Sequence, residues 1–164
     1  MDAVDIAEVL TTTRRIAVVG ASARPERAGN YVFRFLVEKG FDVVGVNPGL
    51  AGQELHGRPV VATLAEAAPL DMVDIFRASA EAGAVIDEAV RLGARTVWTQ
   101  LGVVDRAAAE RAGAAGVKVV MDRCPLQEWQ RVGSLLDAQR VGSLLDAQRV
   151  GSLLDEQRVG LKQS

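Results

Sequence analysis

The sequence is poor in the residues that most often build reactive centres and cross-links. It has one cysteine, one histidine, and aromatic residues at only 4% of its 164 positions. Because Cys124 has no second cysteine to pair with, we expect no internal disulfide and a reducing, cytoplasmic location. His56 lies far from Cys124 in the sequence, so we expect no zinc site and no other metal site. A Ser-His-Asp triad would need His56, which lies in the turn-like stretch "ELHGRP" and is expected on a surface loop.

Long apolar runs and a strong charge of either sign are also missing. No run approaches the roughly 18 apolar residues of a membrane-spanning helix, and "MDAVDIAEVL" lacks the pattern of a signal peptide. The formal net charge is −2, which gives no overall attraction to nucleic acid or anionic membranes. We therefore expect neither as a partner. Apolar residues make up 49% of the chain, which suits a soluble globular protein with one domain.

Apolar runs alternate with amphipathic stretches along most of the chain. Continuous apolar runs are typical of parallel strands that are buried on both faces. We expect five main strands at residues 16–19, 41–46, 72–76, 95–100 and 117–121, with a short strand at 59–62. We expect helices at residues 4–10, 29–39, 81–92 and 106–115, with a short helix at 63–69. This alternation predicts an α/β fold with a doubly wound parallel sheet, which binds ligands at the carboxyl ends of its strands.

The loop after the first strand, "VVGASARPERAGN", is a candidate phosphate site. Gly20 ends a strand just before a helix, where backbone N–H groups and the helix N-terminus attract anions. The stretch departs from G-x-G-x-x-G, because Ser22 and Pro25 replace the second and third glycines. Arg24 and Arg27 would supply fixed positive charge instead. A plain turn with solvated arginines is the alternative.

The second predicted strand ends at Asn47. In an NAD-binding fold this position usually carries Asp or Glu, which binds the ribose 2′-hydroxyl. A carboxylate would repel a phosphorylated ribose, whereas Asn47, with Gly49 and Gly52 nearby, is compatible with one. The sequence therefore favours a phosphorylated adenine nucleotide over NAD. Asn-Pro-Gly is also strong turn chemistry, so Asn47 as a simple strand terminator stays open.

Two further predicted strands end in polar residues on the same edge of the sheet. Arg77 follows "VDIF", and Gln100 and Gly102 follow "VWT". Their positions suit the edge of a nucleotide cleft, although a solvated Arg77 is an alternative. We interpret Trp98 as a core or interface aromatic residue and not as a stacking platform.

Taken in order, "GASARPERAGNYVFRFL", "GVNP", "VDIFR", "VWTQLGV", "AGAAG" and "VVMDRC" resemble the small stand-alone CoA-binding proteins of the Rossmann type. These proteins are similar to the CoA-binding domain of succinyl-CoA ligase alpha subunits. The resemblance covers about residues 5–128. It implies a Rossmann-like fold with coenzyme A as the cofactor, and it implies no particular reaction, because the family has none generally established.

The resemblance also implies roles for residues on the four loops. The turn at 20–22 and Arg27 would hold the phosphates of CoA, and residues 46–48 would lie beside the adenosine and its 3′-phosphate. Residues 76–77 and 100–101 would line the rest of the groove. With Arg24 added, the candidate cofactor-binding residues are Gly20, Ala21, Ser22, Arg24, Arg27, Val46, Asn47, Pro48, Phe76, Arg77, Gln100 and Leu101.

We expect a protein that binds CoA or an acyl-CoA and has no catalytic set. An NAD(H)- or nucleotide-sensing regulatory module and an acyl-CoA enzyme of unknown reaction are the alternatives. A full ligase is disfavoured, because the enzymes that the sequence resembles use a phosphohistidine in a second domain. Cys124, in the "DRC" motif, is interpreted as a buried structural thiol. Its alternative role, a mixed disulfide with the CoA thiol, would require exposure and a lowered pKa.

The end of the chain repeats the nonapeptide "RVGSLLDAQ". We divide the chain into a CoA-binding domain, residues 1–129, and a helical repeat tail, residues 130–164. The composition favours helix, but each copy carries a glycine that costs about 1 kcal/mol relative to alanine inside a helix. The serine of each "SLLD" can begin a new helix, so continuous and broken helices both stay open. The repeat fits either recent tandem duplication or deliberate engineering.

The period of the repeat determines which faces a continuous tail helix would expose. Nine residues make about 2.5 turns of helix. Three residues of the first copy, Val132, Leu135 and Leu136, therefore fall on one side. Their equivalents in the second copy, Val141, Leu144 and Leu145, fall on the opposite side. One side can cover the domain, while the other needs a partner. We predict that the tail forms a homo-oligomer through a helical bundle or an exchanged helix, with disorder as the alternative.

Overall fold

The computed structural model describes residues 3–138, 145 and 148–149. In this part of the chain seven strands form one sheet, in the order β3-β4-β2-β1-β5-β6-β7. The strands are β1 (Arg15–Val19), β2 (Asp42–Val46), β3 (Glu54–Leu55), β4 (Arg58–Val61), β5 (Met72–Ile75), β6 (Thr96–Thr99) and β7 (Lys118–Val120). The α-helices are α1 (Ala3–Thr12), α2 (Ala28–Glu38), α3 (Ser79–Arg91), α4 (Arg106–Ala114) and α5 (Pro125–Arg131). Short 3-10 helices are η1 (Pro48–Leu50) and η2 (Ala65–Ala67).

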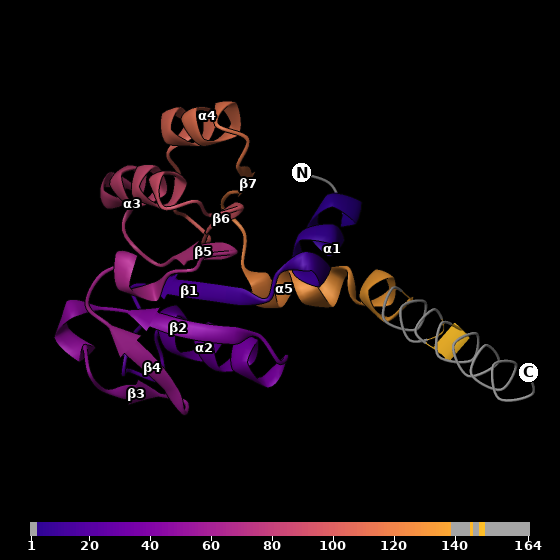
Figure 1. Ribbon diagram of the computed structural model, residues 1–164, viewed down its shortest axis with the longest axis horizontal. Helices are drawn as coiled ribbons and strands as arrows, with labels where there is room; N and C mark the ends of the chain where they lie inside the picture. Colours follow the sequence, from indigo (N-terminus) through magenta and orange to yellow (C-terminus); the bar gives the residue numbers. More distant parts are fainter. Residues whose placement is uncertain (1–2, 139–144, 146–147, 150–164) are drawn as a thin grey trace, which may run out of the picture.

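The order of the strands identifies the fold. The central strand β1 pairs in parallel with β2 on one side and with β5 on the other. The chain builds one half of the sheet outward from β1, returns to the centre at β5 and then builds the other half (Figure 1). The predicted doubly wound, Rossmann-like α/β fold is confirmed. Ligands bind to such sheets where the strand order reverses, which here is the carboxyl end of β1 and β5.

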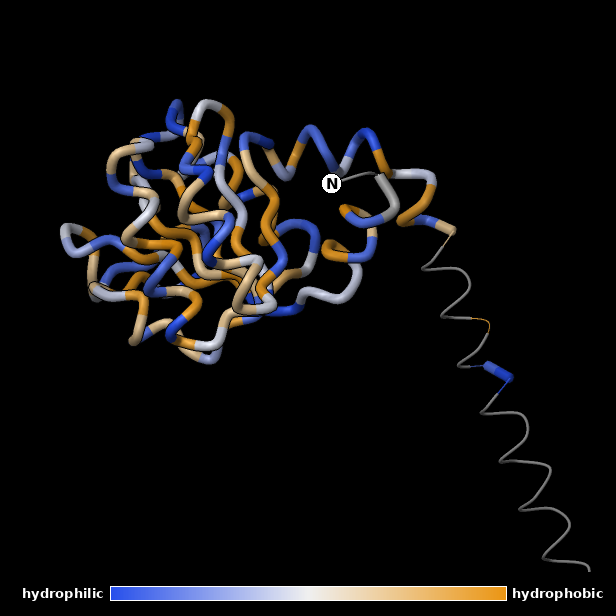
Figure 2. Tube along the Cα trace, turned by 90° about the horizontal axis from the view of Figure 1, so that it is seen from above, coloured by the Kyte–Doolittle hydropathy of each residue, from blue (hydrophilic) through white to orange (hydrophobic). Residues whose placement is uncertain are grey.

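Two buried clusters, one on each face, explain why the strands are continuous apolar runs. In β1, Ile16 and Val18 face the first cluster, with α1, α2 and α5, while Ala17 and Val19 face the second, with α3 and α4. Figure 1 shows these two helical layers on opposite faces of the sheet. Figure 2 shows hydrophobic segments running through the middle of the molecule and hydrophilic segments around its rim.

The structure differs from the sequence predictions at the edge next to β2. The predicted short strand forms β4, so the parallel part of the sheet extends beyond the five main strands. The antiparallel strand β3 was not predicted, because its two residues are too few to show a pattern. The helix predicted over 63–69 is reduced to η2, since Pro69 lacks the N–H group that would extend it. Among the described residues, no helix is long and apolar enough to cross a membrane.

Residues 133–138 continue the chain as a helix after a turn at Val132. Val132 and Leu136 are both 1% exposed and belong to the first buried cluster, together with residues of α1. Leu135 was predicted on the same side as these two residues, but it is 38% exposed, because adjacent residues lie about 100° apart around a helix. Leu145 is 57% exposed. Repeat residues 139–144, 146–147 and 150–164 lie outside the described part of the chain, and with them the predictions for Val141 and Leu144.

Candidate ligand site at the carboxyl ends of the strands

The loops after β1, β2, β5 and β6 enclose a pocket of about 430 Å³, which we call the rim pocket. It brings together predicted residues from all four loops with three that were not predicted. The lining residues are Gly20, Ala21, Ser22, Arg24, Arg27, Ala28, Gly29, Asn47, Phe76, Arg77, Gln100 and Val103.

Two glycines shape the turn between β1 and α2. Gly20 has φ +90°, and a Cβ atom there would lie 2.6 Å from the Phe76 carbonyl oxygen. Gly29, in the first turn of α2, approaches the Gly20 carbonyl oxygen so closely that a Cβ atom would overlap it. Gly29 was missed because the sequence was compared with G-x-G-x-x-G, whereas the second close-packing glycine here comes nine residues after Gly20. A glycine at the start of the helix was the available signal.

Two asparagines brace this turn from neighbouring elements. Asn47 Nδ2 donates to the Ala21 carbonyl oxygen at 2.8 Å, and Asn47 Oδ1 accepts from the N–H of Gly49 at 2.8 Å. Asn30 is 5% exposed, and its Nδ2 donates to the Ser22 carbonyl oxygen at 2.9 Å. Asn47 is therefore both the strand terminator that the sequence allowed and a lining residue that positions the turn. Asn30 had not been singled out.

The exposed turn residue His56 contacts the side chain of Asn30. His56 Nε2 lies 3.0 Å from Asn30 Oδ1, so the imidazole is a hydrogen-bond partner of the Asn30 amide. Its place in the turn between β3 and β4 matches the surface loop that was predicted. It does not line the rim pocket.

The rim pocket is positively charged. Arg24, Arg27 and Arg77 line it, and none of them forms an ion pair with a carboxylate in the described part of the chain. The N-terminus of α2 also opens onto it, with no side-chain cap at Arg27 and no acidic residue in the first turn. Unpaired guanidinium groups beside free helical N–H groups are a favourable setting for phosphate.

A polar pair closes the pocket at β6. Gln100 is 6% exposed, and its Nε2 donates at 2.8 Å to Oδ1 of Asp74, which is 0% exposed. Burial raises the pKa of the Asp74 carboxyl to about 8, although hydrogen bonds from the Gln100 side chain and the Ile75 backbone lower it. Sequence reasoning missed Asp74. The available signal was an acidic residue within the apolar strand "MVDIF".

Three of the predicted residues do not line the pocket. Val46 is 5% exposed, and its side chain packs in the second buried cluster, while its carbonyl oxygen accepts from the N–H of Gly20 at 3.0 Å. Pro48 begins η1 and is exposed. Leu101 follows β6 and is 54% exposed. The β2 strand end therefore reaches the pocket through Asn47.

Cys124 lies in the core, between the end of β7 and the start of α5. It is 7% exposed, precedes α5 as its N-cap residue and belongs to the first buried cluster. That burial supports the structural interpretation over a disulfide with CoA. Across the described residues, no group of three or more His, Cys, Asp or Glu side chains is arranged to hold a metal ion.

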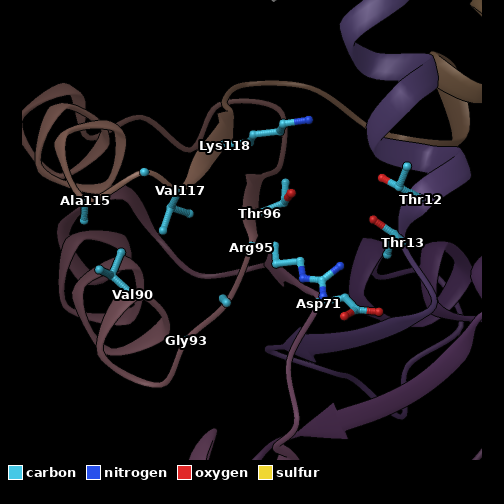
Figure 3. Close-up of a pocket in the computed structure, with 12 residues that line it drawn as sticks. Thr12, Thr13, Asp71, Val90, Gly93, Arg95, Thr96, Ala115, Val117 and Lys118 are labelled. Carbon is cyan, nitrogen blue, oxygen red and sulfur yellow. The ribbon is translucent and has the colours of Figure 1, made fainter.

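A second hollow, of about 440 Å³, lies at the opposite edge of the sheet, where β5, β6 and β7 begin. Figure 3 shows Thr12 and Thr13, at the end of α1, on one side of it and Arg95, Thr96 and Lys118 on the other. We call it the amino-end hollow. Unlike the rim pocket, it lies away from the switch point and from the α2 N-terminus.

Part of the charge in the amino-end hollow is balanced within the protein. Lys118 pairs with Glu8 at 3.4 Å. Asp71 Oδ2 accepts the N–H groups of Arg14 and Arg15 at 3.0 Å each. The bond from Arg15 is the main cause of the lowered pKa of Asp71. Between the two hollows, the rim pocket is the better phosphate site.

Comparison with known proteins gives a family and several similar proteins that are matched over most of their length. The family described as a CoA binding domain matches residues 14–130. The uncharacterized protein YneT of Bacillus subtilis (strain 168) is 35% identical over 121 residues, which is 73% of this chain and 88% of YneT. The structure of cell-free ID.343 from Thermus thermophilus has a TM-score of 0.76 at 34% identity and covers 80% of this chain and 99% of that one. A hypothetical protein from Pyrococcus horikoshii OT3 has a TM-score of 0.75 at 35% identity, covering 80% and 92% respectively.

A more distant structure shares the fold alone. RSP, solved in complex with beta-NAD+ and operator DNA, has a TM-score of 0.50 at 19% identity, covering 87% of this chain and 66% of that one. The family match spans both the β1 turn and the loops after β2, β5 and β6. On the family match and the identity to YneT, this chain belongs to the CoA binding domain family.

Proposed function

We propose that this chain binds coenzyme A or an acyl-CoA in the rim pocket. The observation that carries this proposal is the meeting of three guanidinium groups, which form no ion pair in the described part of the chain, with the uncapped N-terminus of α2. CoA carries a pyrophosphate and a 3′-phosphate, so it suits such a surface better than a neutral ligand does. Membership of the CoA binding domain family points to the same cofactor.

The order of the strands suggests how the cofactor lies. Asn47, Gly20, Phe76 and Gln100 follow one another across the rim because β2, β1, β5 and β6 are neighbours in the sheet. We place the adenosine near Asn47, the phosphates at the β1 turn and Arg27, and the uncharged pantetheine arm toward Gln100. The neutral Asn47 at the end of β2 is compatible with a 3′-phosphate on the ribose, which a carboxylate there would repel.

The composition of the lining favours binding over catalysis. Of the described residues that line the rim pocket, none carries a carboxylate, an imidazole or a thiol. General acid–base or nucleophilic chemistry would therefore have to come from the ligand. NAD(H) sensing is the second candidate, since RSP, which shares the fold, was solved with NAD+.

Calorimetric titration with a ligand panel tests this function. We expect CoA to bind more tightly than dephospho-CoA, which lacks the 3′-phosphate, and more tightly than NAD+. Acyl-CoA should bind about as well as CoA if the thiol end is not recognised. NAD+ binding as tightly as CoA, or tighter, would replace the CoA assignment with the nucleotide-sensing one.

We further propose that the repeat tail mediates self-association. In the first copy, Val132 and Leu136 belong to the buried cluster that includes α1, while Leu135 is exposed, as is Leu145 of the second copy. Exposed leucines that recur along a tail are a typical contact surface between helices. A second copy of this chain is the proposed partner, because its tail carries the same apolar residues.

A further inference from the structure

Beneath the rim pocket lies a carboxyl group that the proposed function does not use. Asp74 is 0% exposed, and its Oδ2 atom has no hydrogen-bond partner among the described residues. Its other oxygen, Oδ1, accepts from Gln100, which is a lining residue of the rim pocket. A buried carboxyl with one unsatisfied oxygen is destabilising for the fold, so its presence next to a ligand pocket calls for a role.

The bond to Asp74 determines which end of the Gln100 amide is available to a ligand. Nε2 is engaged by Asp74, whereas Oε1 accepts no hydrogen bond in the described part of the chain. The Gln100 backbone is fixed as well. Its N–H donates to the Ile75 carbonyl oxygen, and its carbonyl oxygen accepts from the N–H of Val103. Gln100 Oε1 is therefore a hydrogen-bond acceptor held at a defined position in the rim pocket.

We propose that Asp74 is a positioning residue of the ligand site, which holds Gln100 so that Oε1 accepts a hydrogen bond from an amide N–H of the ligand. The pantetheine arm of CoA carries two such amides. The inference rests on the proposed CoA function and on the placement of that arm near β6. Asp74 does not touch the ligand itself, since Gln100 lies between them.

The surroundings of Asp74 keep it uncharged near neutral pH. Its register neighbours are Val18 on β1 and Trp98 on β6, both 0% exposed. Its pKa is raised to about 8 by burial, and no charged side chain is among the causes of the shift. A neutral carboxyl beneath the pocket adds no negative charge to a site for a polyanionic ligand, whereas the ionised form would repel it.

Other ionisable groups belong to the elements on the same face of the sheet. They include Asp5 and Glu8 on α1, Tyr31, Arg34 and Glu38 on α2, His56 before β4, Arg58 on β4, Lys118 on β7, Arg123 and Cys124 before α5, and Glu128 and Arg131 on α5. Glu128 and Cys124 are the buried members of this set. The charge of Glu128 is balanced by Arg123 at 3.2 Å and Arg131 at 2.6 Å. Asp74→Asn leaves all of these groups in place, so a midpoint near pH 8 that disappears in this variant is assigned to Asp74.

Two substitutions separate positioning from mere packing. Asp74→Asn keeps an acceptor for Gln100 and cannot ionise, so CoA affinity at pH 7 should stay within about twofold of the wild type. Asp74→Leu keeps the side chain buried and similar in size but removes the hold on Gln100, so affinity should fall roughly three- to tenfold. Gln100→Ala should cause a similar loss, and Asp74→Leu should add little to it, because the two residues act as one unit.

The test is a CoA titration of the full chain from pH 7 to pH 9, with thermal unfolding to establish that each variant is folded. Wild-type affinity should fall roughly three- to tenfold across a midpoint near pH 8, and Asp74→Asn should show no such fall. In parallel, the side-chain amide signal of Gln100 in the ligand-free protein, identified by its absence in Gln100→Ala, should shift with the same midpoint.

The outcomes are distinguishable. If CoA does not bind at any pH while the Gln100 signal titrates, the proposed function fails and the Asp74–Gln100 coupling stands. If CoA binds, but Asp74→Leu keeps wild-type affinity and the pH profiles of wild type and Asp74→Asn coincide, the positioning role is overturned and the proposed function remains.

Discussion

The carbonyl oxygen of Gly20 lies where the Cβ atom of any other residue at position 29 would have to be. The first turn of α2 therefore packs directly against the β1 turn, with no side chain between them. This close approach places the α2 N-terminus at the rim pocket, where its N–H groups face the same space as Arg24 and Arg27. The geometry of the proposed phosphate site thus depends on two glycines.

Gly29→Ala is expected to destabilise the protein by about 1–3 kcal/mol, because the added methyl group must push backbone atoms apart. CoA binding should weaken as well. Gly113→Ala is the matched control, since Gly113 lies exposed in α4 with open space around its Cβ position. That change should stabilise the helix by up to about 1 kcal/mol. Urea unfolding measures the free energy of unfolding of each variant. Equal stability of Gly29→Ala and the wild type would show that the packing of α2 against the β1 turn does not require glycine at position 29.

Removing a guanidinium group from the rim pocket should weaken CoA binding. We expect Arg27→Ala to lower the affinity about tenfold, because a charge-assisted hydrogen bond to phosphate is lost. Arg24→Ala and Arg77→Ala should act in the same direction, and the losses should shrink at high salt. Arg111→Ala is the control, since Arg111 pairs with Asp87 at 3.0 Å and does not line the pocket. Wild-type affinity in Arg27→Ala, measured by calorimetry, would take Arg27 out of the site.

The raised pKa of Asp74 predicts a pH dependence of stability. An unfolded aspartate has a pKa near 3.8, whereas folded Asp74 titrates at about 8, so the folded protein binds the proton more tightly. The stabilisation is fully present below the unfolded pKa and is lost progressively as pH rises to about 8. Asp74→Asn should remove this slope and be the more stable protein at pH 8. Urea unfolding of both chains from pH 5 to pH 9 tests it, and parallel profiles would contradict it.

Truncation at two positions should separate the contribution of the tail to the buried core from its proposed role in self-association. A chain ending at Ala138 keeps Val132 and Leu136 in the first buried cluster and should be monomeric with nearly unchanged stability. A chain ending at Trp129 also loses these buried side chains and should be destabilised by roughly 2–5 kcal/mol. Analytical ultracentrifugation of the full chain and of the chain ending at Ala138 gives the masses. The same mass for both would show that the tail is not an assembly device.

Much of the fold could be predicted, because strands buried on both faces must be apolar throughout, as Ile16 to Val19 are. The edge strand β3 could not, since Glu54 and Leu55 owe their conformation to pairing with β4 and not to a pattern of their own. The short helix predicted over 63–69 is only η2, which ends at Ala67, because Pro69 has no N–H group to continue the helix.

The candidate site was predictable where residues carry charge or end a strand, as with Arg27 and Asn47. It was not predictable where the role comes from contact between distant segments. Gly29 matters because the Gly20 carbonyl approaches it, and Asp74 matters because Gln100 reaches down to it from the next strand. Asn30 likewise gains its role from the Ser22 carbonyl.

A crystal structure of the full chain with CoA tests the central claim most directly. We expect the phosphates to lie against the turn at Gly20 and beside Arg27, with the adenosine near Asn47 and the pantetheine arm toward Gln100. CoA in the amino-end hollow beside Arg95, or no bound CoA at saturating concentration, would contradict the account.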